Sequence, residues 1–362
     1  MPVIDADTHV DETEDTWEYM APSELNLKPM VGFPANPDPK LPPTRYWMID
    51  GERQPRLRRS DEKTHTKVEA RELLDVKVRL ADMDSLGVQT HVIYPTMFLI
   101  QPTLNPETDT AIKRSYNRWL GDRCVQSGGR LRWNILPLLF DMEATVEELR
   151  WGKEHGAVGV LKKGDKETGK YVADPYFYPL WKEAENLDLA ICFHTGSGIF
   201  DRVSAKEAPY AVGRLQYPVL IAFQSLLQNG ISRKFPRLRF GFIEAGASWL
   251  PYVLYNLERR IHRPGEGQGQ AGGGGEPNYD LTKNMLVDNN MFVTCQVDED
   301  LAYVTKMVGE DSILVGSDYT HADQSQERDF QQHLGDRAAE GAITKVGLER
   351  IMYDNPKRLY GL

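Results

Sequence analysis

The sequence predicts a (β/α)₈ TIM barrel with long inserted loops, and three observations support this fold class. Short runs rich in β-branched and aromatic residues recur eight times along the 362 residues, and helical-period segments separate most of them. Such alternation is typical of a parallel barrel, and this length is common for one barrel with added loops. The first run ends in Asp-Ala-Asp-Thr-His rather than a glycine-rich phosphate turn, which argues against the competing doubly wound open sheet.

The elements follow in order along the chain. The predicted strands are residues 3–7, 90–95, 133–138, 157–161, 189–194, 238–244, 292–297 and 313–318. The predicted helices between them are residues 70–86, 109–126, 143–155, 178–186, 217–227, 249–262 and 299–308.

Two segments interrupt this alternation and are predicted to be inserted loops. The first, about residues 20–65, is rich in proline and has no clear periodicity. The second, about residues 264–290, contains the glycine-rich stretch 264–277. Neither resembles a repeat or a separate domain, so residues 1–362 are predicted to form a single domain.

Composition limits the classes of partner. The formal net charge is −10, from 43 basic and 53 acidic residues, which argues against a nucleic-acid partner. No apolar run approaches the roughly 18 residues of a membrane helix, and no leader precedes the first strand, so we expect a cytoplasmic protein without a membrane partner. Cys124, Cys192 and Cys295 have no metal-type spacing and are expected to be buried thiols.

Self-association is expected from the first inserted segment. Tyr46, Trp47 and Met48 lie in it as a short apolar stretch that could form an exposed surface. We therefore predict a homodimer or a higher homo-oligomer.

Three histidines fall at or just past the ends of predicted strands, where a barrel carries its chemistry. They are His9, His194 and His321, which follow the first, fifth and eighth strands. Asp7 lies two residues before His9, so the two side chains leave an extended backbone on the same face. The other five histidines are expected to be structural or exposed; they are His65, His91, His155, His262 and His333.

Carboxylates also end two of the apolar strands, at Glu244 and Asp318. A buried carboxylate needs a cation or a hydrogen-bond network nearby. We expect Asp7, His9, His194 and Asp318 to converge and bind one divalent metal ion, with Zn²⁺ as the first expectation and Mn²⁺ or Fe²⁺ as alternatives. A polar cluster without metal is the competing interpretation.

Four motifs now carry a resemblance to a known family. They are Asp5-Ala-Asp-Thr-His9, Cys192-Phe-His-Thr-Gly196, Glu244-Ala-Gly-Ala-Ser-Trp-Leu-Pro251 and Gly316-Ser-Asp-Tyr-Thr-His321. In this order they resemble the amidohydrolase superfamily, in the branch of aminocarboxymuconate-semialdehyde decarboxylase. The closing residues 355–360 are similar to the family's terminal helix.

The resemblance implies a barrel with one divalent metal, in which His9, His194 and Asp318 match family ligands. Asp7 stands where many members have a histidine and some have a carboxylate. The decarboxylase pattern places a base before the glycine of the third motif, where this chain has Ala245. Because alanine cannot move a proton, its role passes to Asp318, His321 or Glu244.

These residues favour a metal-dependent hydrolase of a small, aromatic or heterocyclic substrate. A metal-bound water would displace an amine, amide, halide or nitro group, with Asp318 orienting or deprotonating that water. His321 would protonate the leaving group, and Glu244 would act as acid or base, or else hold Trp249 or a backbone amide in place.

Four further residues are candidates for binding the substrate. Lys162 and Lys163 would meet an anionic or nitro group, unless they form ion pairs with neighbouring acids. Trp249 and Tyr319 would supply flat walls for a ring, unless they belong to the core.

Two alternative functions remain open. The first is a non-oxidative decarboxylase of an aromatic or enamine carboxylate, in which the metal would hold the carboxylate. The second is a non-catalytic barrel that binds a ligand.

Overall fold

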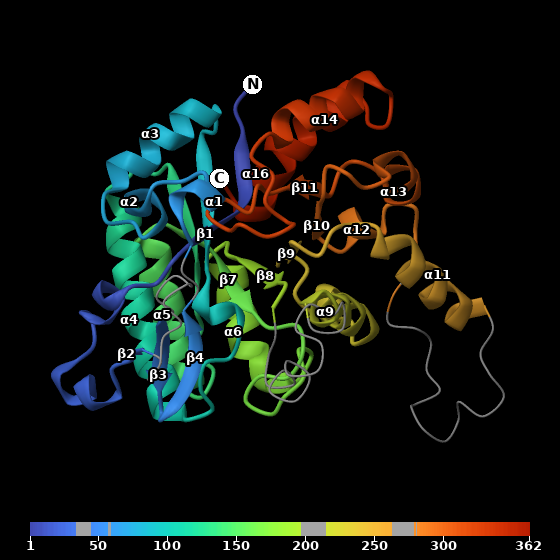
Figure 1. The fold of residues 1–362 in the computed structure, drawn as a ribbon. Coiled ribbons are helices and arrows are strands. Elements are labelled where there is room, and N and C mark those ends of the chain that lie inside the picture. Colours follow the sequence, from blue (N-terminus) through green and yellow to red (C-terminus); the bar gives the residue numbers. More distant parts are fainter. Residues whose placement is uncertain (34–44, 57–58, 197–214, 263–278, 280) are drawn as a thin grey trace.

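Eight parallel strands form the centre of the molecule (Figure 1). The computed structural model describes residues 1–33, 45–56, 59–196, 215–262, 279 and 281–362. The strands pair in the order β1 (Ile4–Val10), β5 (Thr90–Pro95), β6 (Leu131–Ile135), β7 (Ala157–Lys162), β8 (Ala190–His194), β9 (Phe240–Ile243), β10 (Met291–Cys295) and β11 (Ile313–Val315). A parallel bridge between Thr8 and Tyr319 brings the segment after β11 beside β1. The predicted barrel is confirmed.

Helices separate the strands and cover the outside of the barrel. The longer ones are α3 (Val76–Leu86), α4 (Pro106–Val125), α5 (Met142–Glu154), α6 (Tyr178–Asn186), α9 (Tyr217–Gln228), α11 (Trp249–His262), α13 (Leu301–Val308) and α14 (Phe330–Ala339). The short ones are α1 (Asp61–Thr64), α2 (Val68–Arg71), α10 (Ile231–Lys234), α12 (Met285–Asp288), α15 (Lys345–Glu349) and α16 (Asn355–Tyr360). The helix predicted over residues 70–86 is divided into α2 and α3, because Leu73 has a left-handed φ of 49° and Asp75 caps the start of α3.

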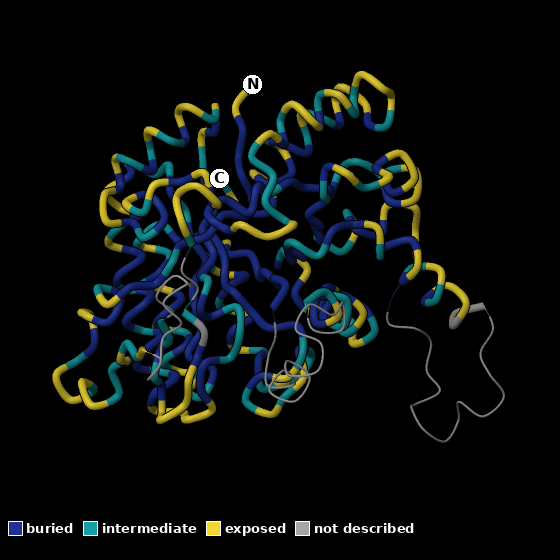
Figure 2. The backbone as a smooth tube through the Cα atoms, viewed as in Figure 1, coloured by how far each residue is buried: buried dark blue, intermediate teal, exposed yellow. Residues whose placement is uncertain are grey.

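The strands are buried on both faces, because side chains fill the interior and helices cover the exterior (Figure 2). On β9, Gly241 faces the interior, where an added Cβ would lie 3.3 Å from Cys192 Sγ. Phe242 faces outward and packs against Phe223 of α9. Side chains alternate along a strand, so Ile243 is directed inward. The three cysteines are buried free thiols, as predicted.

The first inserted segment contains more regular structure than the sequence indicated. Its strands β2 (Met30–Gly32), β3 (Arg45–Ile49) and β4 (Glu52–Arg56) form an antiparallel sheet, and residues 34–44 lie outside the described part of the chain. Trp47 of β3 is 1% exposed and packs edge-on against Trp17. The expectation that Trp47 forms an exposed apolar surface is therefore wrong. Self-association stays a prediction.

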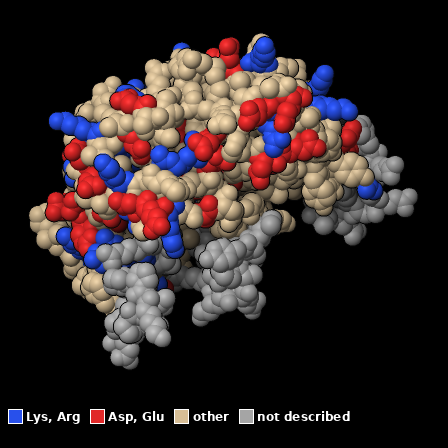
Figure 3. All heavy atoms as spheres, turned by 45° about the horizontal axis from the view of Figure 1, so that its top comes forward, with Lys and Arg blue, Asp and Glu red and all other residues tan. Residues whose placement is uncertain are grey.

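The second inserted segment lies largely outside the described residues, which include only position 279 and the part from 281 onward, with α12. No helix in the described ranges is long and apolar enough to cross a membrane. On the face shown in Figure 3, acidic and basic side chains are interspersed.

Tyr360 of the C-terminal helix α16 contacts residues of the barrel strands β1 and β5. The Tyr360 hydroxyl donates to the main-chain oxygen of Ala6 at 2.8 Å and lies 2.8 Å from the Tyr94 hydroxyl. The Tyr94 ring is 5.0 Å from that of His194. Tyr360 thus ties the end of the chain to the layer next to His194.

Candidate metal centre

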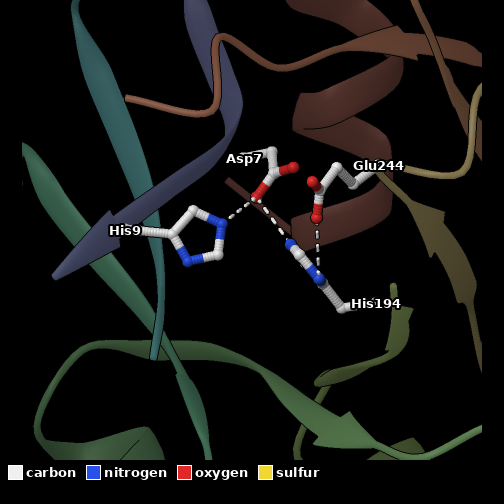
Figure 4. Close-up of side chains that lie close together, drawn as sticks. All are labelled: Asp7, His9, His194 and Glu244. Carbon is white, nitrogen blue, oxygen red and sulfur yellow. Dashed lines mark hydrogen bonds and ion pairs between the residues drawn. The ribbon is translucent and has the colours of Figure 1, made fainter. Parts of the chain in front are cut away.

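Asp7 joins the first and fifth strands of the barrel. Both Asp7 and His9 are part of β1, and Asp7 Oδ1 lies 3.3 Å from His9 Nε2. The same oxygen lies 3.2 Å from Nε2 of His194, the last residue of β8 (Figure 4). All three residues are at most 2% exposed. The predicted common face of Asp7 and His9 is therefore present, and it is directed at His194.

Each of the two histidines has one nitrogen occupied by the main chain. His9 Nδ1 lies 2.9 Å from the oxygen of Pro95, and His194 Nδ1 lies 2.9 Å from the oxygen of Thr195. A carbonyl oxygen can only accept, so Nδ1 carries the proton in each neutral ring. Both Nε2 atoms are then lone-pair donors directed at Asp7, which is the arrangement that metal-binding histidines adopt.

The segment after β11 supplies Asp318 and His321. Asp318 Oδ1 lies 3.2 Å from His9 Nε2 and 2.8 Å from His321 Nδ1. The His321 ring stacks on His9 at 3.7 Å, and its Nε2 lies 3.0 Å from Thr96 Oγ1. His321 therefore packs between Asp318 and Thr96.

Glu244 is the side chain that reaches the centre from the end of β9. Simple alternation after the inward Ile243 would direct residue 245 inward, where the sequence analysis located the missing base. Glu244 instead has a left-handed φ of 63°, which ends the alternation. Its Oε2 lies 3.2 Å from His194 Nδ1 and accepts a hydrogen bond from Thr195 Oγ1 (Figure 4). The residue of this segment beside the metal ligands is therefore a carboxylate at 244.

Burial governs the electrostatics of this centre. Burial, followed by repulsion from Asp318, raises the pKa of Glu244 to about 8. Burial also raises the pKa of Asp318, although His9 opposes this shift. For Asp7, burial is outweighed by the charges and hydrogen bonds of His194 and His9, which lower its pKa. Two mutually repelling carboxyl groups, of which Asp318 is fully buried and Glu244 only 10% exposed, favour a bound cation.

The donor set fits a divalent metal ion. His9 Nε2 and both carboxylate oxygens of Asp318 are buried and make no hydrogen bond within the described part of the chain. The ligand atoms of Asp7, His9, His194 and Glu244 all lie within 4.8 Å of one another, as do those of His9, Asp318 and His321. Imidazole nitrogens with carboxylate oxygens suit Zn²⁺, Mn²⁺ or Fe²⁺.

The structure does not bring Tyr319 to this centre. Its side chain lies against α3, where the hydroxyl donates to Asp82 Oδ2 at 2.6 Å and the guanidinium carbon of Arg79 is 4.7 Å from the ring centroid. Tyr319 is fully buried in this position.

Trp249 begins α11 and is half-buried on the outer side of β9. Its indole nitrogen donates to the Gly246 oxygen, and its ring packs edge-on against Phe223 and Phe242. Because Phe242 faces outward, this ring lies behind the strand rather than in the barrel interior.

The two candidate lysines have different surroundings. Lys162 Nζ lies 2.5 Å from Glu167 Oε2 and 4.1 Å from the centroid of Phe177, so it forms an internal ion pair. Lys163 follows the end of β7, and its Nζ donates to the main-chain oxygen of Phe98.

Sequence reasoning missed the residues that hold His321 in place. Glu12 accepts hydrogen bonds from the backbone nitrogens of Thr96 and Met97 at 3.0 and 2.9 Å. It thereby fixes the turn whose Thr96 hydroxyl contacts His321. The available signal was a glutamate three residues after His9, but only the folded path of residues 96–99 shows what it contacts.

The buried carboxyl group of Glu12 should make the free energy of unfolding depend on pH. Burial raises its pKa to about 7, so the folded protein favours the protonated form more than the unfolded chain does. This contribution to stability is present below the unfolded pKa near 4.5 and is lost as the pH rises through 7. We expect the free energy of unfolding of Glu12→Gln, relative to the wild type, to increase by up to about 3 kcal/mol between pH 5 and pH 8.

Denaturant unfolding of both proteins at four pH values measures this difference. Glu143→Gln, at an exposed position of α5, serves as the control and should show no such trend. A pH-independent difference for Glu12→Gln would contradict the account of its burial.

Comparisons with known proteins agree with the motifs. The sequence matches the Amidohydrolase family over residues 4–362. It is 27% identical over 200 residues to gamma-resorcylate decarboxylase of Rhizobium sp., a match that covers 52% of this chain and 61% of that relative. It is 24% identical over 257 residues to 2-amino-3-carboxymuconate-6-semialdehyde decarboxylase of Dictyostelium discoideum, which covers 68% and 66%. The match to the first relative thus spans less than two thirds of its length.

Solved structures show the same fold. An amidohydrolase from Mycobacterium avium subsp. paratuberculosis K-10 has a TM-score of 0.77 at 18% identity, covering 100% of this chain and 98% of that chain. The 5-carboxyvanillate decarboxylase of Novosphingobium aromaticivorans, solved with bound manganese and 3-methoxy-4-hydroxy-5-nitrobenzoic acid, has a TM-score of 0.65 at 19% identity, covering 82% and 83%.

Proposed function

The chain belongs to the amidohydrolase family, and from this premise we propose that it is a metal-dependent decarboxylase of a small aromatic carboxylate. Hydrolysis was the first expectation from sequence. The relatives that match the sequence are decarboxylases, and the structural relative with bound manganese is also a decarboxylase, which supports the alternative. That manganese supports Mn²⁺ at least as well as Zn²⁺.

The observation that carries the proposal is the position of Glu244. Decarboxylation must deliver a proton to carbon, which requires an acid beside the bound substrate. The Glu244 carboxyl group lies beside His194, and Thr195 and His194 hold its Oε2. Oε1 is therefore the oxygen left to carry the proton.

Asp7, His9, His194 and Asp318 would hold the metal ion, which, when bound, supplies positive charge to a substrate carboxylate and its neighbouring oxygen. The His321 Nδ1 atom lies 2.8 Å from Asp318, and Thr96 contacts the other nitrogen of the imidazole. These contacts restrict the ligand side chains to one geometry before the substrate arrives.

The reaction step is a proton transfer to carbon. Glu244 gives its proton to the ring carbon that carries the carboxylate, and the bond between that carbon and the carboxylate breaks. The electron pair of this bond restores the aromatic ring, and carbon dioxide leaves. The Glu244 carboxylate then takes a proton from solvent, so the enzyme returns to its starting state.

Hydrolysis stays the second candidate because of the contact between Asp318 and His321. A carboxylate without a hydrogen-bond partner among the described residues, next to an imidazole, is a suitable base for a water molecule. In that case Glu244 would protonate the leaving group instead of carbon.

A product assay separates the two candidates. The metal-loaded protein is incubated with 2-hydroxybenzoates and, in parallel, with aromatic lactones and amides. We expect release of carbon dioxide from at least one hydroxybenzoate and no ring opening of the lactones. Hydrolysis of lactones or amides without any carbon dioxide would refute the proposed reaction.

A further inference from the structure

Lys163 is a buried cation without a carboxylate partner among the described residues. It is 7% exposed, and its Nζ donates to the main-chain oxygen of Phe98. The preceding residue, Lys162, differs because it forms an ion pair with Glu167. Asp165 lies two residues away and forms no ion pair with Lys163 in this part of the chain.

Close backbone contacts fix the position of Lys163. Gly164 follows it, and a Cβ there would lie 1.8 Å from the oxygen of Pro218, so the chain cannot shift outward. The acceptor is fixed as well, because the Phe98 ring packs edge-on between Trp17 and Tyr116. The ammonium group is therefore held at one place.

That place is on the same side of the barrel as the metal centre. Lys162 pairs with Phe193 in the parallel ladder of β7 and β8, so Lys163 lies beside His194. Thr96, which contacts His321, is in the same turn as the Phe98 carbonyl that accepts from Lys163. Lys163 therefore lies next to the metal ligand His194 and to the turn of Thr96 and Phe98, which contacts His321.

An ammonium group in this position is costly unless an anion joins it. Burial lowers the pKa of Lys163 to about 8; Glu167, and more weakly Asp165 and Asp109, act in the opposite direction without pairing with it, and Lys113 adds to the lowering. Lys113 itself is paired with Asp109 at 2.8 Å. A negatively charged group on a ligand could form the ion pair with Lys163 that the described residues do not provide.

We propose that Lys163 binds a second anionic group of the substrate, so that the natural substrate is an aromatic compound with two acidic groups. One group is the carboxylate held by the metal and lost as carbon dioxide, and the other stays on the ring and pairs with Lys163. The inference rests on the proposed function for the identity of the first group. It goes further because it distinguishes diacids from monoacids.

Calorimetry with unreactive ligands tests this without turnover. The metal-loaded protein is titrated with benzoate and with the 1,2-, 1,3- and 1,4-benzenedicarboxylates. We expect at least one dicarboxylate to bind about 10 to 100 times more tightly than benzoate, as a charge-assisted hydrogen bond in a buried site provides. Lys163→Met should reduce this preference to less than about threefold and leave benzoate affinity unchanged.

Two further variants control for charge and for packing. Lys166→Met removes the same charge from an exposed position of the same segment and should keep the full preference. Lys163→Gln keeps a donor for the Phe98 carbonyl but no charge, so it should lose the preference as Lys163→Met does. Because methionine replaces an unpaired buried charge, Lys163→Met should unfold at a temperature no lower than that of the wild type.

Two results would overturn the inference. One is that no dicarboxylate binds more tightly than benzoate to the wild type. The other is that Lys163→Met or Lys163→Gln retains the preference, or weakens benzoate and dicarboxylate equally. Neither result concerns carbon dioxide release, so failure of this inference can be told apart from failure of the decarboxylase proposal.

Discussion

Replacement of His194 by alanine is expected to abolish binding of the divalent metal ion and to lower kcat/KM by about 10³-fold or more. His194 Nε2 lies 3.2 Å from Asp7 Oδ1, its other nitrogen is held at the Thr195 oxygen, and alanine supplies no ligand atom in its place. A bound metal provides several kcal/mol of transition-state stabilisation, which corresponds to this loss of rate. Metal content is measured by mass spectrometry of the purified variant.

His91→Ala is the matched control for this experiment. His91 is also a fully buried histidine on a barrel strand, β5, but its side chain faces α3, where Arg79 Nε donates to its Nδ1. This variant should retain the wild-type metal content. Equal loss of metal from both variants would show that His194 acts through folding rather than as a ligand.

Replacement of Glu244 by glutamine is expected to lower kcat by about 10²- to 10⁴-fold while the metal content stays unchanged. Glutamine has nearly the same size and can still accept from the Thr195 hydroxyl, but it cannot give a proton to carbon. The rate of a single turnover and the metal content are measured on the same preparation.

Thr195→Val tests how much of that loss comes from positioning. It removes the hydrogen bond to Glu244 but leaves the carboxyl group, so its effect should stay below about tenfold. If Glu244→Gln loses the metal, Glu244 is a ligand and not the acid. If Glu244→Gln keeps the wild-type kcat, the proton comes from another group.

The barrel could be predicted because its signals are local. Short β-rich runs and helical-period segments alternate, and all eight predicted strands overlap observed ones. The neighbourhood of Asp7, His9, His194 and Asp318 followed from this alone, because polar residues at the ends of parallel strands meet on one face of the barrel.

The side-chain directions after the strands end could not be predicted. Glu244 and Asp318 both have left-handed φ values, 63° and 52°, which are rare for residues other than glycine and reverse the direction that alternation gives. The family motif placed the exchanged base at position 245, whereas the folded chain directs the carboxylate of residue 244 at the metal ligands. Tyr319, next to Asp318, was expected to contact the substrate, but its ring packs against α3.

Tertiary contacts decided the remaining differences. Trp47 was expected to be exposed because it lies in a proline-rich segment without clear periodicity, but pairing of β3 with β4 turns it against Trp17. Glu12 and Thr96 act on His321 only through the path of the turn after β5. Contacts between residues so far apart in the chain leave no periodic signal.

The most direct test of the proposed reaction is a single incubation, in D₂¹⁸O, of the metal-loaded protein with a 2-hydroxybenzoate that also carries a halide on the ring, so that either the carboxylate or the halide can be lost. Decarboxylation predicts one carbon dioxide per product and one deuterium on the ring carbon that carried the carboxylate. It predicts no ¹⁸O bonded to the ring. A product with ¹⁸O on the ring and no carbon dioxide would contradict the proposed reaction and establish hydrolysis in its place.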